Sequence, residues 1–125
     1  MDIVVRNASG KPIYEQIASQ IKNLILGGAL KEGGALPSMR RLAQELRISV
    51  ITTKRAYEEL EREGLISSVP GKGSFVACKD PEWIREEHLR MVEELLRRAA
   101  DMARRGGISL EELTGVLAMF YEEEA

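Results

Sequence analysis

The residues of this chain that are best suited to bind a polyanion lie close together in one short stretch. From Ser49 onward, the sequence places hydroxyl, apolar and cationic side chains on nearly successive positions, namely Ser49, Val50, Ile51, Thr52, Lys54 and Arg55. The first turns of a helix can reach base edges in a DNA groove, and cations close to them attract phosphates. We therefore predict a nucleic-acid-binding surface at this point.

The same stretch could instead be an ordinary amphipathic helix with a solvated charged side, but two details oppose that reading. Val50 and Ile51 are apolar at a helix start that should be exposed. The Lys54–Arg55 pair also comes early and four glutamates come late, which reverses the order that the helix dipole favours. Both details fit a helix start that meets phosphate groups.

A second candidate contact is the turn at 70–73, which carries Gly71, Lys72 and Gly73. We predict strands at 65–69 and 74–77, so the turn would be the tip of a β-hairpin with accessible backbone N–H groups and one cation. Such a tip suits contact with DNA backbone or the minor groove. A nucleotide-binding P-loop is disfavoured, because its first glycine is absent and a strand rather than a helix follows.

Predicted helices position these residues. Ser38 is suited to cap a helix over 39–46, and Ser49 to cap a helix that ends at Gly64. The second of these helices would bury one face, which consists of Thr53, Ala56, Tyr57 and Leu60. An earlier helix begins at Ile13, with Gln16 and Gln20 facing outward, and residues 2–5 are expected to form an edge strand. The fold class is therefore mostly α with a small β-hairpin, in the order of a winged helix-turn-helix.

Charge and composition divide the chain near residue 80. Residues 1–79 hold 12 basic and 8 acidic side chains, whereas residues 80–125 hold 6 and 12, although the whole chain of 125 residues carries only −2. We predict a DNA-binding domain at 1–79 and a tail at 80–125. No apolar run approaches the about 20 residues of a membrane span. One cysteine and the lack of a secretory signal fit a cytoplasmic protein.

The tail is expected to form two amphipathic helices, from residue 80 to about 105 and from Ser109, which opens a capping box with Glu112. Their apolar stripes are too wide to be buried in each other, so we predict a homodimer through these helices, although packing on the chain's own DNA-binding domain is the alternative. The predicted dimer interface consists of Trp83, Leu89, Val92, Leu95, Leu96, Ala99, Leu113, Leu117, Phe120 and Tyr121.

No residues point to catalysis. His88 is the only histidine and is expected on a helix surface, and Cys78 is expected to be a plain residue at a strand end. Neither has partners at the spacing of a metal site or an activated nucleophile. We therefore expect no enzyme activity, no metal and no cofactor.

The stretch LPSMRRLAQELRISVITTKRAYEELEREGLISSVPGKGSFV resembles the winged helix-turn-helix of the GntR family of transcription regulators, and the likeness extends back to Pro12. The resemblance implies that Arg40 contacts DNA, that Ser49 to Thr52 read bases, and that Lys54, Gly71 and Lys72 bind alongside. Ser38, Arg55 and Gly73 adjoin these positions and are included in the predicted surface. Val50 stands where the family frequently has an arginine, so a bidentate contact to guanine is absent and apolar contact with thymine methyls is open to Val50 or Ile51.

The short two-helix tail resembles the YtrA-like branch of the family. This resemblance implies a dimerisation device and regulators that often act on transporter operons. We predict a homodimeric repressor or regulator of a roughly palindromic operator. The alternatives are a winged helix that binds proteins without sequence-specific DNA binding, and a sensor with a small-molecule pocket between tail and wing.

Overall fold

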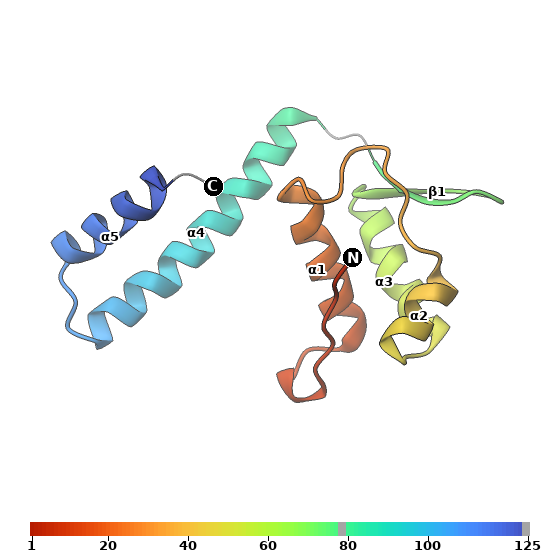
Figure 1. Ribbon diagram of the computed structural model, residues 1–125, viewed down its shortest axis with the longest axis horizontal. Helices are drawn as coiled ribbons and strands as arrows, with labels where there is room; N and C mark the ends of the chain where they lie inside the picture. Colours follow the sequence, from red (N-terminus) through yellow and green to blue (C-terminus); the bar gives the residue numbers. More distant parts are fainter. Residues whose placement is uncertain (78–79, 124–125) are drawn as a thin grey trace. The chain divides into compact units, whose positions relative to one another are not determined.

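The computed structural model describes residues 1–77 and 80–123, so the prediction for Cys78 lies outside the described residues. The chain divides into two compact units, Met1–Ile84 and Arg85–Ala125. Figure 1 shows the order of the elements, which are η1 (Asn7–Ser9), α1 (Ile13–Leu26), α2 (Met39–Leu46), α3 (Val50–Arg62), β1 (Ile66–Val69), β2 (Gly73–Val76), α4 (Pro81–Arg105) and α5 (Leu110–Glu122). The predicted mostly α fold with a small hairpin is confirmed.

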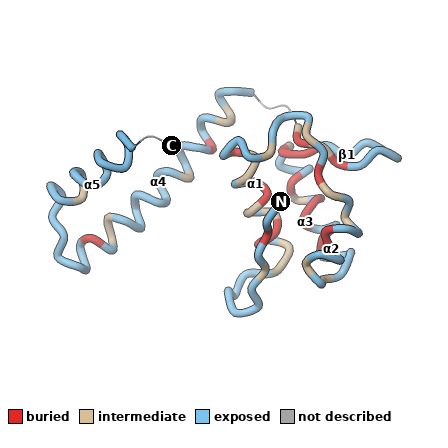
Figure 2. Tube along the Cα trace, viewed as in Figure 1, coloured by how far each residue is buried: buried red, intermediate tan, exposed pale blue. Residues whose placement is uncertain are grey.

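The core of the first unit lies between α3 and the two helices packed on it, α1 and α2 (Figure 2). Its largest fully buried side chains include Tyr57, Ile17, Leu42 and Leu60. Within each helix the buried apolar residues recur at helical spacing, so the sequence pattern identifies the buried face of each helix. The Tyr57 hydroxyl donates to the carbonyl oxygen of Pro37 at 2.7 Å, so the one polar group of the ring is satisfied and the start of α2 is tied to α3.

Two serines begin the helices of the helix-turn-helix. The Ser38 hydroxyl accepts from the backbone N–H of Arg41, and the Ser49 hydroxyl accepts from the backbone N–H of Thr52, each at 3.1 Å. Between the helices, Arg47 has a φ of 56°, the left-handed conformation that glycine usually takes in such turns. The predicted caps are present, and they fix how the start of α3 leaves the turn.

The N-terminal segment differs from the prediction. Residues 2–5 form no strand, because their backbone groups bond to side chains of α1 rather than to a second strand. The Gln20 side chain bonds both the N–H and the C=O of Val4, at 2.9 and 2.7 Å. The side chain of Gln16 does the same for Arg6, at 2.8 and 2.9 Å. Gln16 was expected to face outward and is instead buried, because its amide replaces the missing strand partner.

The hairpin is antiparallel, with Ile66 opposite Val76 and Val69 opposite Gly73. The segment before α2 pairs with the outer edge of β2, since the backbone N–H of Leu36 donates to the carbonyl of Ser74 and Ala35 bridges Phe75. The wing is therefore joined on one edge to the chain that leads into α2, which holds hairpin and helix-turn-helix in one unit.

The boundary between the units falls inside α4, whereas the sequence placed it before residue 80. Trp83 explains the difference, because its ring packs partly buried against the core of the first unit. The first turn of α4 therefore belongs with the winged helix. This environment also distinguishes Trp83 from the other residues of the predicted dimer interface, which all lie in the second unit.

The second unit is a pair of helices with very little interior. The helix α5 contains no buried residue among those described, and its capping box, Ser109 with Glu112, is formed. The helices α4 and α5 are not among the closely packed element pairs of the described chain. Their large apolar side chains are mostly exposed, with Phe120 at 65% and Tyr121 at 88%. No helix in the described ranges is both long and apolar enough to cross a membrane.

Candidate DNA-binding surface

The start of α3 presents an apolar tip. Val50 is 44% exposed and Ile51 80% exposed, although a helix start in water usually carries polar side chains. The first turn contains no acidic residue, so no carboxylate of that turn offsets the positive end of the helix dipole. The tip can therefore accept an anion beside it while the apolar side chains extend outward.

Ser38, Ser49 and Thr52 are predicted to contact DNA, and their hydroxyls also form hydrogen bonds within the protein. The two serine hydroxyls cap their helices, and the hydroxyls of Ser49 and Thr52 lie 2.8 Å apart. Part of the hydrogen-bonding capacity of each hydroxyl is thus used within the turn. Their contribution to DNA binding is in part the placement of the helix starts.

The two cations in the first half of α3, Lys54 and Arg55, are exposed but oriented differently. The Lys54 Nζ lies 4.0 Å from Glu58 Oε1, a distance that leaves the ammonium largely solvated. The Arg55 guanidinium lies over the ring of Tyr14 with its Cζ 3.9 Å from the centroid, a cation–π contact that connects α3 to α1. Tyr14 could not be identified from the sequence, because it is distant from Arg55 and no periodicity pairs the two residues.

Arg40 and Arg41 follow the Ser38 cap at the start of α2. Arg41 pairs with Glu45 at 3.1 Å, and this pair occupies its guanidinium on the surface of α2. Arg40 is exposed and has no ion-pair partner within the described ranges, so its guanidinium is available for a phosphate. The contact of Arg40 with DNA remains a prediction.

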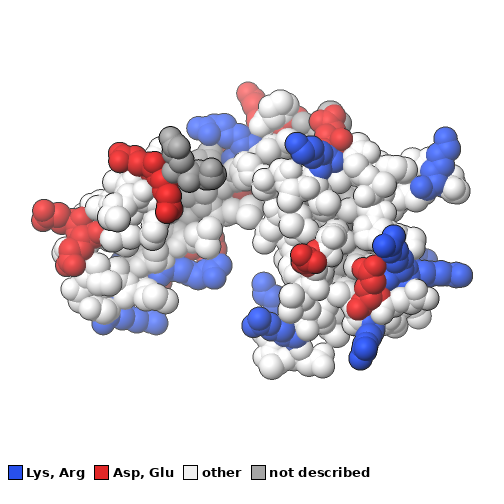
Figure 3. Space-filling view, viewed as in Figure 1, with Lys and Arg blue, Asp and Glu red and all other residues white. Residues whose placement is uncertain are grey.

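The wing tip is a tight turn that only glycine makes easily. Gly71 and Gly73 have φ values of 77° and 105°, and the backbone N–H of Lys72 donates to the carbonyl of Val69 at 2.9 Å. The side chain of Lys72 is therefore left as the exposed cation of the turn. Figure 3 shows a basic group projecting at the end of the hairpin and others around α2.

All predicted DNA-binding residues lie in the first unit and on three of its parts: the start of α2, the start of α3 and the hairpin. Figure 1 shows α2 and the hairpin on the side of α3 that faces away from α1. The arrangement suits a helix in the major groove with a second, basic contact on the adjacent backbone.

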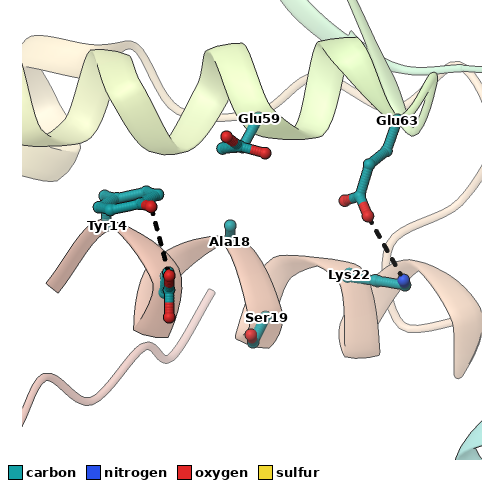
Figure 4. Close-up of a pocket in the computed structure, with 7 residues that line it drawn as sticks. Tyr14, Ala18, Ser19, Lys22, Glu59 and Glu63 are labelled. Atoms are coloured by element: carbon teal, nitrogen blue, oxygen red, sulfur yellow. Dashed lines mark hydrogen bonds and ion pairs between the residues drawn. The ribbon is translucent and has the colours of Figure 1, made fainter. Parts of the chain in front are cut away.

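The opposite side of α3 has a different character. A groove of about 310 Å³ runs between α1 and α3 and is lined by Tyr14, Glu15, Ala18, Ser19, Lys22, Glu59 and Glu63 (Figure 4). Lys22 pairs with Glu63 at 3.7 Å, and the other charged side chains of the lining are carboxylates. Carboxylates repel phosphates, so this face is unsuited to DNA.

Two further hollows, of about 350 and 420 Å³, are open depressions on the surface of the first unit. A second cavity of about 80 Å³ lies within the first unit, lined mostly by apolar residues that include Leu30, Val76 and Trp83. This volume is well below that of an ordinary ligand pocket. No three His, Cys, Asp or Glu side chains gather as a metal site in the parts of the chain that the structure describes.

Known proteins share this arrangement. Residues 13–76 match the family described as bacterial regulatory proteins, gntR family. The chain is 39% identical over 105 residues to the HTH-type transcriptional repressor YtrA of Bacillus subtilis, which covers 84% of this chain and 81% of that protein. YtrA from Sulfolobus acidocaldarius, a GntR-family transcription factor, matches with a TM-score of 0.59 and 35% identity, over 79% of this chain and 97% of that one. AraR(DBD) in complex with operator ORX1 matches with a TM-score of 0.55 and 28% identity, over 62% and 96%.

The winged helix and the matches above identify a DNA-binding transcription regulator rather than an enzyme. The chain belongs to the gntR family of bacterial regulatory proteins and is YtrA-like within it.

Proposed function

We propose that this chain is a repressor that binds a roughly palindromic operator as a homodimer. The observation that carries the proposal is the apolar tail face, which we define as the predicted interface without Trp83: Leu89, Val92, Leu95, Leu96, Ala99, Leu113, Leu117, Phe120 and Tyr121. Most of its larger side chains are about half exposed, so covering each of them would contribute roughly half of the about 1.5–3 kcal/mol of complete burial, and a chain with this face exposed is expected to associate.

A second copy of the chain is the partner that fits this face best. The polar side of α4 is satisfied by its own ion pairs, as in Glu94 with Arg97 at 3.4 Å and with Arg98 at 3.8 Å, which leaves the apolar side as the surface that lacks a cover. Two identical helix pairs can cover each other in a closed two-fold arrangement. In a homodimer the partner is another copy of the same chain, so no second protein is required.

Two-fold symmetry then sets the form of the DNA site. Each subunit would place the start of α3 in a major groove, with half-sites one helical turn apart or further. Arg40, Lys54 and Lys72 would contact phosphates beside it, so affinity should fall steeply as salt rises. The wing would lie on the flanking backbone.

The similarity to the transcriptional repressor YtrA supports repression as the outcome of binding. A bound dimer on a promoter excludes polymerase from the same DNA, so no further domain is required for this effect. Because the tail resembles that of the YtrA-like branch, we propose a transporter operon as the target. The protein would act in the cytoplasm.

Two measurements test the proposal together. Sedimentation equilibrium at micromolar concentration should give twice the mass of the chain, and mobility shifts with the protein's own promoter should weaken linearly in a plot of log affinity against log salt. A mass of one chain would contradict the dimer. A promoter shift without salt dependence, or no shift, would contradict operator binding and favour a protein-binding module.

A further inference from the structure

The start of α3 is apolar where most DNA-reading helices are polar, and we propose that Ile51 and Val50 read thymine methyl groups in each half-site. This inference rests on the proposed function, because it names the bases that the same surface would recognise. Ile51 is 80% exposed at the first turn, so its side chain makes few contacts inside the protein. An apolar side chain this exposed gains most from a partner that covers it.

The hydroxyls of Ser49 and Thr52 and the guanidinium of Arg55 already have partners within the protein, whereas the Lys54 ammonium is largely solvated and is assigned to phosphate. The Ser49 hydroxyl accepts from the backbone N–H of Thr52 at 3.1 Å, and the two hydroxyls lie 2.8 Å apart. One turn later, the Arg55 guanidinium lies over the ring of Tyr14 with its Cζ 3.9 Å from the centroid, so reaching a base would require it to leave that contact. The groups best placed to meet base edges are therefore the two apolar ones.

Base chemistry identifies what an apolar side chain can recognise in the major groove. Guanine, adenine and cytosine present hydrogen-bond donors and acceptors there, and thymine alone adds a methyl group at C5. An aliphatic side chain pressed on donors or acceptors would take them from water without replacing their hydrogen bonds, which is unfavourable. Against a thymine methyl, the same side chain buries apolar surface on both sides.

The test begins without a known operator. The full-length chain is used to select duplexes from a random DNA library, and the enriched half-sites are expected to hold thymine at one or two positions facing the start of α3. Each such thymine is then replaced by deoxyuridine, which removes only the methyl group. We expect an affinity about fourfold lower per methyl, since this corresponds to about 0.8 kcal/mol for one buried carbon. The same replacement at thymines outside the half-site should have no effect.

Variants assign the effect to the side chains. For Ile51→Ala, binding to the unmodified duplex should weaken, and the difference between thymine and uracil at its position should disappear. For Val50→Arg, selection should shift towards guanine, because arginine pairs with guanine through two hydrogen bonds. Val4→Ala is the matched control, since Val4 is a 57% exposed aliphatic side chain on the N-terminal segment, and it should retain the full uracil effect.

The possible outcomes distinguish a failure of thymine-methyl recognition from a failure of operator binding. Enriched half-sites whose affinity is unchanged by uracil, or a uracil effect that persists in Ile51→Ala and Val50→Ala alike, would overturn the methyl readout and leave operator binding intact. If no sequence were enriched, the proposed function would fail and this inference with it.

Discussion

The two units of this chain differ in how far they bury their apolar side chains. In the winged helix, α1, α2 and α3 enclose Tyr57, Ile17 and Leu60 completely, and the cations are left outside. In the tail, α5 encloses nothing among its described residues and exposes aromatic and aliphatic side chains. One unit has a core of its own, whereas the other resembles half of a core. The comparison teaches that stability in the first should be a property of one chain, and in the second a property of two.

The largest expected effect is in the winged-helix core. Leu60→Ala removes a fully buried side chain and should lower the free energy of unfolding by about 2–5 kcal/mol, at any protein concentration. Chemical denaturation measures it. Leu95→Ala in the tail is the comparison, because Leu95 is mostly exposed within one chain. Its effect should shrink towards zero as the protein is diluted below the dimer dissociation constant, because Leu95 is covered only in the dimer. An effect independent of concentration would mean that the tail is covered by its own chain.

The next largest effect is on the proposed dimer interface of the tail. Leu117→Glu would place a charge in the centre of the proposed interface and should raise the dimer dissociation constant at least about 100-fold, or about 2.7 kcal/mol. Sedimentation velocity measures the dissociation, and circular dichroism should show the winged helix still folded. Met119→Glu is the matched control, since Met119 is equally apolar and lies on the opposite side of α5. Equal dissociation by both variants would refute the assigned face.

A smaller effect separates capping from DNA contact at Ser49. Ser49→Ala should lower stability by about 1 kcal/mol, because the N–H of Thr52 loses its acceptor. Ser49→Asp should restore most of that stability, since aspartate also caps helices, yet weaken DNA binding by placing a carboxylate beside phosphate. Thermal melts and mobility shifts on both variants test this. Two variants that weaken DNA binding in proportion to stability would indicate a structural role only.

Because of the buried tyrosine, the stability of the winged helix should depend on pH in the alkaline range. Burial, aided by the charge of Glu45, raises the pKa of Tyr57 from 10.0 to about 12. Below pH 10 the hydroxyl is protonated in both states and its contribution is fully present. As pH rises from about 10 to about 12, the unfolded chain loses the proton first and stability falls. Tyr57→Phe should remove this component and the hydrogen bond to Pro37, worth about 1 kcal/mol at neutral pH. Identical alkaline unfolding curves would contradict the assignment.

The smallest effect is at the wing tip. Lys72→Ala should weaken binding by a similar factor on all DNA sequences and lower the slope of log affinity against log salt by about 1 for each wing. Titrations at several salt concentrations measure the slope. Lys11→Ala, an exposed cation outside the predicted surface, serves as control. A change in base preference with no change in slope would show that Lys72 reads bases instead.

Local features of the sequence were sufficient to predict the helices, both serine caps, the hairpin and its glycine turn. These depend on neighbouring residues and on periodicity, as with Ser38 before α2 and Gly71 at the tip. Contacts between distant segments were missed. Gln16 looked like a surface residue because polarity says nothing about a backbone partner in another segment, and Tyr14 gave no sign that it lies under Arg55. Trp83 fitted the apolar pattern of the tail, yet it packs on the winged helix because α4 begins before the first unit ends.

The turn between α2 and α3 has a practical consequence. Arg47 takes a left-handed backbone conformation that disfavours any side chain with a Cβ, by about 1 kcal/mol or more. Glycine would adopt the same turn without that strain, and the side chain of Arg47 belongs neither to the core nor to the predicted DNA-binding residues. This junction is therefore a natural point at which to engineer a more heat-resistant form of the protein for crystallisation or for sensor design.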